Sequence, residues 1–133
     1  MKYVIAYGGT AAVLAVLDAV WLTFAGRLLY RPAVGSLMME SGFRLAPAIV
    51  FYVLYVLGVV IFAVSPALKS GQWTTAVLMG GLFGFFCYAT YDLTNMATLK
   101  VWPLKVTLID LAWGVFLTAT AATVGFLAAK RFA

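Results

Sequence analysis

Hydrophobic residues form four long runs along the chain, and short polar segments separate these runs. The runs cover approximately residues 3–24, 45–64, 73–93 and 104–129. An α-helix rises about 1.5 Å per residue, so roughly 20 apolar residues cross the ~30 Å hydrocarbon core of a bilayer. The pattern predicts an all-α fold, an integral membrane bundle of four transmembrane helices, with residues 1–133 forming a single domain.

Polar and helix-breaking residues mark the expected connections. The longest connection is 27–44, which contains an Arg-Pro pair at 31–32, and a short interfacial helix over 37–39 or an ordinary loop both fit it. The Ser-Pro pair at 65–66 is expected to end the second helix. Positive charges are divided almost evenly between the two sides of the membrane, so the orientation stays open.

Composition agrees with a membrane location. Hydrophobic residues make up 65% of the chain and charged residues 10%, whereas soluble domains carry about 25% charge. Basic residues are scattered between the apolar runs, which excludes a nucleic-acid surface. With no histidine and one cysteine, Cys87, which we interpret as a small core residue, we expect no metal site, cofactor or intrachain disulfide.

Three of the four acidic residues lie inside or at the edges of the apolar runs. They are Asp18, Asp92 and Asp110, whereas Glu40 lies in a polar connection among arginines. A carboxylate at membrane depth costs at least about 2.5 kcal/mol, so it requires a structural or functional reason. Four spans would bring all three aspartates to the same side of the membrane, where helices in a bundle can converge on one polar pocket.

Small residues recur every three or four positions on three of the predicted helices, which places them on one helical face and permits close helix contact. We therefore expect the first, third and fourth helices to pack together and the second to be the most exposed to lipid. The three sets are Gly8, Ala11, Ala15 and Asp18; Ala76, Gly80, Gly84, Tyr88 and Asp92; and Asp110, Gly114, Thr118 and Ala122.

Residues 18–24 and 110–116 share the pattern Asp-x-x-Trp-x-x-Phe, although the two helices run in opposite directions. Aromatic rings beside carboxylates suit a cation or an amphipathic ligand, while tryptophan is also common at membrane interfaces. The candidate ligand-binding residues are Asp18, Trp21, Tyr88, Asp92, Asn95, Thr98, Lys100, Asp110 and Trp113.

Several arrangements could stabilise three carboxylates in one apolar pocket. Lysine or arginine could pair with them, one could hold a proton, or a bound cation could compensate their charge. Alternatively, the aspartates only bridge helices through hydrogen bonds. A divalent cation held by the aspartates and Asn95 is a further alternative that we do not favour.

The run from Tyr91 to Asn95, followed by Trp102-Pro103-Leu104 and Asp110, resembles a family of predicted bacterial membrane proteins catalogued as domain of unknown function 2177. The N-terminal half is also similar to that family. The remaining residues that carry the resemblance are Ala97, Thr98, Lys100, Val106, Thr107, Trp113, Gly114, Asp18, Trp21, Leu22, Tyr30, Gly35 and Tyr52. The resemblance implies a small multi-pass protein of the bacterial inner membrane and no established activity.

Together these features favour a membrane protein that binds, and transforms or moves, an amphipathic or lipid-like ligand at a pocket on one side of the membrane. Whether it is an enzyme stays open, because the sequence contains no nucleophile–base pair. The alternatives are a proton- or cation-coupled transporter acting as a homo-oligomer, and an accessory subunit of a larger membrane complex. Expected partners are membrane lipids.

Overall fold

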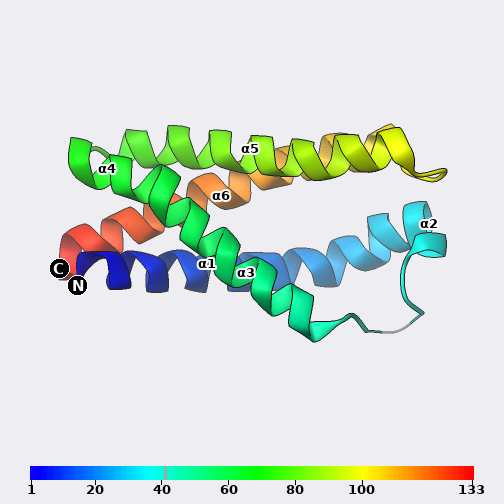
Figure 1. Ribbon diagram of the computed structural model, residues 1–133, viewed down its shortest axis with the longest axis horizontal. Helices are drawn as coiled ribbons and strands as arrows, with labels where there is room; N and C mark the ends of the chain where they lie inside the picture. The colour runs from blue at the N-terminus through cyan, green and yellow to red at the C-terminus, as the bar shows by residue number, and fades with distance from the viewer. Residues whose placement is uncertain (41) are drawn as a thin grey trace.

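The computed structural model describes residues 1–40 and 42–133, and this part of the chain contains four helices long and apolar enough to cross a membrane. They cover Lys2–Leu37, Leu45–Ser70, Trp73–Thr98 and Leu104–Phe132, which confirms the predicted all-α membrane bundle. Both termini lie at one end of the bundle (Figure 1). The α-helical segments are α1 (Lys2–Ala25), α2 (Arg31–Val34), α3 (Leu45–Val59), α4 (Ser65–Ser70), α5 (Trp73–Thr98) and α6 (Leu104–Phe132).

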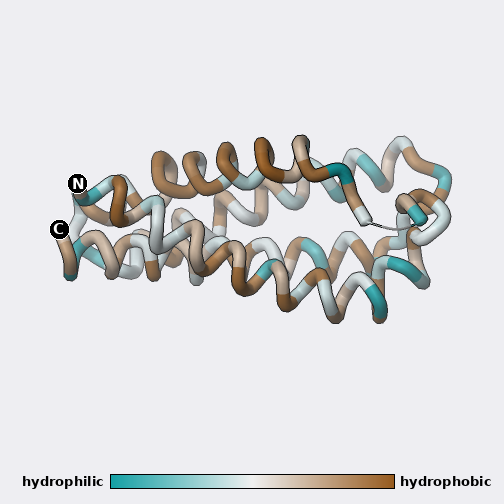
Figure 2. Tube along the Cα trace, turned by 90° about the horizontal axis from the view of Figure 1, so that it is seen from below, coloured by the Kyte–Doolittle hydropathy of each residue, from teal (hydrophilic) through white to brown (hydrophobic). Residues whose placement is uncertain are grey.

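Hydrophobic residues predominate along the helices, and hydrophilic ones are more frequent toward the two ends of the bundle (Figure 2). At about 1.5 Å per residue, even the 26-residue helices are roughly 39 Å long, which exceeds the apolar thickness of a bilayer. The helix ends therefore extend into the interfacial regions.

Two prolines that were expected to break helices instead lie within continuous ones. The first helix does not end near residue 24, because a π-helical turn, Gly26–Tyr30, joins α1 to α2, and a 3₁₀ turn, Gly35–Leu37, completes it. A second π-helical turn, Val60–Val64, joins α3 to α4. Each π turn directly precedes an X-Pro pair. The wider turn accommodates the proline ring, which would clash with a carbonyl oxygen in a regular α-helix.

Helix α6 packs along both α1 and α5. Its contact with α5 is backbone-close, because a Cβ atom on Gly84 would overlap the Gly114 carbonyl oxygen and the Thr118 side chain. The stripes predicted on the third and fourth helices are confirmed. Their small residues and aspartates are buried, namely Ala76, Gly80, Gly84 and Asp92 on α5 and Asp110, Gly114, Thr118 and Ala122 on α6.

The predicted small-residue face of the first helix is wrong. Gly8 is exposed, with no atom within 4 Å of a Cβ placed on it. The close approach to α6 occurs instead at Thr10, whose hydroxyl oxygen occupies the space that a Cβ on Gly125 would need. The buried face of α1 is Ala6, Thr10, Leu14 and Asp18.

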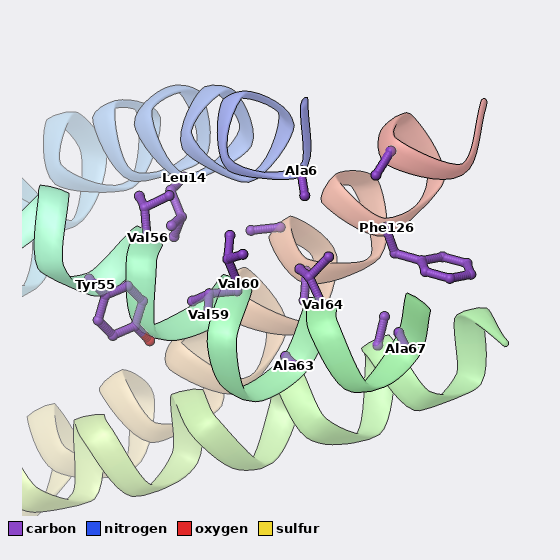
Figure 3. Close-up of a cluster of buried hydrophobic side chains, with 14 of the residues drawn as sticks. Ala6, Leu14, Tyr55, Val56, Val59, Val60, Ala63, Val64, Ala67 and Phe126 are labelled. Atoms are coloured by element: carbon purple, nitrogen blue, oxygen red, sulfur yellow. The ribbon is translucent and has the colours of Figure 1, made fainter. Parts of the chain in front are cut away.

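The hydrophobic core lies toward the end that carries the termini, and the second helix contributes much of it (Figure 3). Val59, Ala63 and Val64 are fully buried, and α3 and α4 run obliquely across the bundle (Figure 1). The expectation that this helix is the most lipid-exposed is therefore wrong, since the apolar window of the first helix has the smallest buried share. Within the second helix, Leu45–Ser70, the exposed residues are concentrated in the N-terminal half of α3.

Candidate functional site

A pocket of about 580 Å³ lies in the half of the bundle away from the termini. It is within the range of ligand sites, which is about 300–1,000 Å³. The first helix, α3, α5, the connection after α5 and α6 all contribute to its wall. The lining residues include Asp18, Trp21, Tyr30, Tyr52, Tyr88, Tyr91, Asn95, Trp102, Asp110 and Trp113, together with aliphatic and methionine side chains.

Asp110 is held by a hydrogen-bond chain that starts on the first helix. The indole N–H of Trp21 donates to the hydroxyl of Tyr30 at 3.0 Å, and that hydroxyl donates to Asp110. Tyr30 is the last residue of the π turn that precedes the Arg31-Pro32 pair. The extra residue in this turn changes the register of the helix, so the proline-linked irregularity determines which face presents Tyr30.

Asp18 has a similar partner on the second helix. The hydroxyl of Tyr52 on α3 donates a hydrogen bond to its carboxylate. The indole N–H of Trp113 lies near the same carboxylate, yet this buried donor forms no hydrogen bond within the described chain. The site therefore contains an oriented donor without a partner, which an oxygen of a ligand or water could accept.

The two Asp-x-x-Trp-x-x-Phe segments meet at the pocket. The indole rings of Trp21 and Trp113 stack with centroids 4.4 Å apart and planes inclined by 8°. Because α1 and α6 run in opposite directions (Figure 1), each tryptophan lies near the aspartate of the other segment, Trp113 directly and Trp21 through Tyr30. This cross-over explains why the same spacing occurs on two antiparallel helices.

Asp92 lies directly behind Asp110 and does not itself line the pocket. It is fully buried, and neither carboxylate oxygen forms a hydrogen bond among the described residues, although the indole N–H of Trp102 lies near it. Its carboxyl group is within hydrogen-bonding reach of that of Asp110. Ionised carboxylates only accept hydrogen bonds, so this pair forms one only when a proton lies between them. The three aspartates therefore lie near one another, but only Asp18 and Asp110 line the pocket on which all three were expected to converge.

The charge of the site is one-sided. No lysine or arginine is among the described residues that line the pocket, although five of the chain's nine basic residues lie in the segments 27–44 and 99–105 on this side. No group of three or more potential metal-ligating side chains occurs in residues 1–40 and 42–133. Among the described residues, pairing of the pocket aspartates with basic side chains is therefore not seen.

Six of the nine candidate residues from the sequence line the pocket, and three do not. Asp92 lies behind Asp110, as described above. Thr98 is exposed and bonds locally to the Thr94 carbonyl oxygen at 2.8 Å, and Lys100 is exposed in the connection after α5. Helix α5 ends at Thr98, and in the connection that follows it Leu99 and Trp102 line the pocket whereas Lys100 does not. Among the lining residues that sequence reasoning did not select are four aromatic ones with polar tips, Tyr30, Tyr52, Tyr91 and Trp102. Their shared signal is an aromatic residue with a polar tip, close to a span end.

The fold and the composition of its spans define a multi-pass membrane protein with four helices and an acidic, aromatic pocket. Residues 3–127 match the family model described as "Predicted membrane protein", domain of unknown function 2177. Since the match covers nearly the whole chain, the protein belongs to this family, as the sequence resemblance indicated. Neither the comparison with curated proteins nor that with solved structures found a match.

Proposed function

We propose that the protein binds an amphipathic ligand whose polar headgroup enters the acidic, aromatic pocket while its apolar part stays in the membrane. The observation that carries the proposal is the combination of a sizeable pocket with buried polar groups left without protein partners. These groups are the indole N–H groups of Trp102 and Trp113, which line the pocket, and both oxygens of Asp92, which lies behind Asp110. Buried polar groups are normally satisfied, so unsatisfied ones beside a cavity favour a ligand or ordered water as the missing partner.

The charge of the pocket favours a headgroup rich in hydrogen-bond donors. Asp18 and Asp110 are acceptors that each already receive a tyrosine hydroxyl, and Asp92 adds a third carboxyl group behind them. An ammonium or polyol headgroup supplies donors, and an ammonium also gains from the aromatic faces. An anionic phosphate or carboxylate headgroup would be repelled, because no basic side chain of the described residues lines the pocket.

Two other functions are less well supported. A purely accessory role would leave the aspartates paired with protein groups and without a cavity, whereas a pocket adjoins them here. Transport through one chain would need a polar route to the other side, but a hydrophobic cluster that includes Val59, Val64 and Phe126 occupies the half of the bundle toward the termini. An oligomer that brings additional surfaces together would be required for transport.

The test is the identity of amphiphiles that co-purify with the protein. We expect mass spectrometry of lipids extracted from the protein in mild detergent to find an enriched species with a donor-rich headgroup. The species should be lost in Asp110→Asn and retained in Glu40→Gln, which removes an exposed carboxylate outside the pocket. Lipid composition that is the same in all three samples would contradict the proposal.

The same comparison in cells separates binding from chemistry. If the protein transforms its ligand, cells that lack it should accumulate the substrate and lose the product. If it only binds or moves the ligand, whole-cell composition should stay unchanged while the purified protein still carries the species.

A further inference from the structure

A second, smaller cavity of about 330 Å³ adjoins the acidic pocket. It lies between α3 and α5 and is lined by Phe51, Tyr55, Cys87, Tyr88 and Tyr91. Three of these residues, Phe51, Tyr88 and Tyr91, also line the acidic pocket. The two cavities therefore lie side by side and share a wall, with aspartates around the first and mainly aromatic side chains around the second.

The walls of the second cavity, which we call the aromatic groove, present rings in place of polar groups. The hydroxyl of Tyr55 bonds to that of Thr118 in the bundle core at 2.7 Å, so its polar tip is turned away and its ring remains for the groove. The groove contains none of the aspartates. Phe51 is about half exposed on the outer surface, so the groove opens toward the surrounding lipid.

We propose that the aromatic groove binds the hydrocarbon chain of the same amphiphile whose headgroup occupies the acidic pocket. This inference rests on the proposed function. It adds where the hydrocarbon chain of the ligand binds and the path by which it enters. A single alkyl chain suits an apolar cavity that adjoins the headgroup pocket and lies between α3 and α5. The ligand would enter laterally from the membrane, with its headgroup reaching Asp18 and Asp110 and its chain lying along Tyr55 and Cys87.

The position of the bound hydrocarbon chain is a sharper test than the affinity of the protein for the amphiphile. A hydrocarbon chain in a bilayer is already removed from water, so entry into the groove gains packing contacts and little hydrophobic transfer energy. Octadecylamine with a diazirine at mid-chain is a suitable probe, because photolysis attaches it to the residues beside the chain. The full-length protein in phosphatidylcholine nanodiscs provides competing lipid around every exposed surface.

We expect photolabelling to concentrate at Phe51, Tyr55 and Cys87, well above the level at Leu78, which is exposed on the outer surface of the same helix, α5. Cys87→Phe fills the groove and should lower labelling at Phe51 and Tyr55 to the level of Leu78. Leu78→Phe introduces the same ring on the lipid-facing surface and should leave the labelling unchanged. Circular dichroism of both variants verifies that the helices are intact.

Removing the headgroup anchor separates the two proposals. Native mass spectrometry measures the bound amine in wild type and in Asp18→Asn, and we expect bound amine and groove labelling to fall together in the variant. Bound amine that depends on Asp18, with labelling at Phe51 and Tyr55 no higher than at Leu78, would overturn the groove assignment and leave the headgroup site. Bound amine and labelling that are both unaffected by Asp18→Asn, or no bound amine in wild type, would overturn both.

Discussion

The indole rings of Trp21 and Trp113 lie stacked, 4.4 Å between centroids and 8° from parallel, although they belong to opposite ends of the chain. The stack joins the first helix to α6 between Asp18 and Asp110. It therefore fixes the distance between the two walls of the pocket that carry those carboxylates. Aromatic pairs of this kind contribute about 0.5–1.5 kcal/mol beyond the area they bury.

Because stacked indoles couple electronically, the protein should give a paired positive and negative signal in far-ultraviolet circular dichroism, seen in the difference between wild type and a tryptophan variant. Trp21→Phe and Trp113→Phe should each abolish the paired signal and lower the free energy of unfolding by about 0.5–1.5 kcal/mol. Trp73→Phe removes an exposed tryptophan and should preserve it. A paired signal that survives Trp113→Phe would show that the stack is absent.

The tyrosine hydroxyls that bond to buried carboxylates should contribute measurably to stability. Tyr30→Phe and Tyr52→Phe each remove one donor to a carboxylate, and the expected loss is about 1.5–3 kcal/mol of unfolding free energy for a bond to a charged group. Tyr3→Phe is the matched control, because its hydroxyl lies near Ser65 at an exposed position. Reversible unfolding in mixed micelles measures the change in the free energy of unfolding for each variant. An equal loss in all three variants would contradict the hydrogen bonds of Tyr30 and Tyr52 to the aspartates.

Glycines at the helix contacts should be far less replaceable than exposed ones. Gly84→Ala places a Cβ on the Gly114 carbonyl oxygen, so we expect a loss of about 1–3 kcal/mol, the usual cost of overpacking. Gly8→Ala has no neighbour within 4 Å and should be neutral or slightly stabilising. Gly58→Ala meets only the end of the Phe83 ring, which can rotate, so its effect should be intermediate. Thermal unfolding of the three variants gives this order, and a neutral Gly84→Ala would refute the close contact.

Asp92 offers a way to separate function from structure. Its carboxylate oxygens form no hydrogen bond among the described residues. The amide N–H that Asp92→Asn introduces can donate to Asp110, so we expect the free energy of unfolding to rise by about 1–3 kcal/mol. The same variant should abolish binding of the ligand, as should Asp110→Asn. The double variant should bind no less ligand than either single variant. Exposed Glu40→Gln should be silent. A strongly destabilised Asp92→Asn with normal ligand binding would mean that Asp92 is a structural bridge.

The sequence was most informative where small residues are rare enough to define a face. From Gly80 to Asp92 on α5 and from Asp110 to Gly114 on α6, the glycines and aspartates at multiples of four are separated mostly by larger side chains, so the contact surface was recognisable. On the first helix Gly8, Gly9, Ala11 and Ala15 occupy several faces, so small size alone could not select the buried one. The true face contains Thr10, a residue that size-based reasoning omitted.

The site residues that sequence reasoning missed depend on long-range geometry. Tyr30 reaches Asp110 only because the first helix continues through a π turn past the Arg31-Pro32 pair, which read as a break. Tyr52 reaches Asp18 because α3 crosses the bundle obliquely, and no local pattern encodes that angle. Asp18, Asp92 and Asp110 were found because a charge within an apolar run is conspicuous in any helix.

The most direct test of the central claim is tryptophan fluorescence of the Trp73→Phe protein during titration with dodecylamine, with dodecanoate as the anionic control. Trp21, Trp102 and Trp113 then remain, and all three line the acidic pocket. The pocket assignment predicts a saturable change with the amine that is absent with dodecanoate and abolished by Asp18→Asn combined with Asp110→Asn. A change of equal size with both amphiphiles, or one that persists in the double variant, would contradict the acidic pocket as a headgroup site.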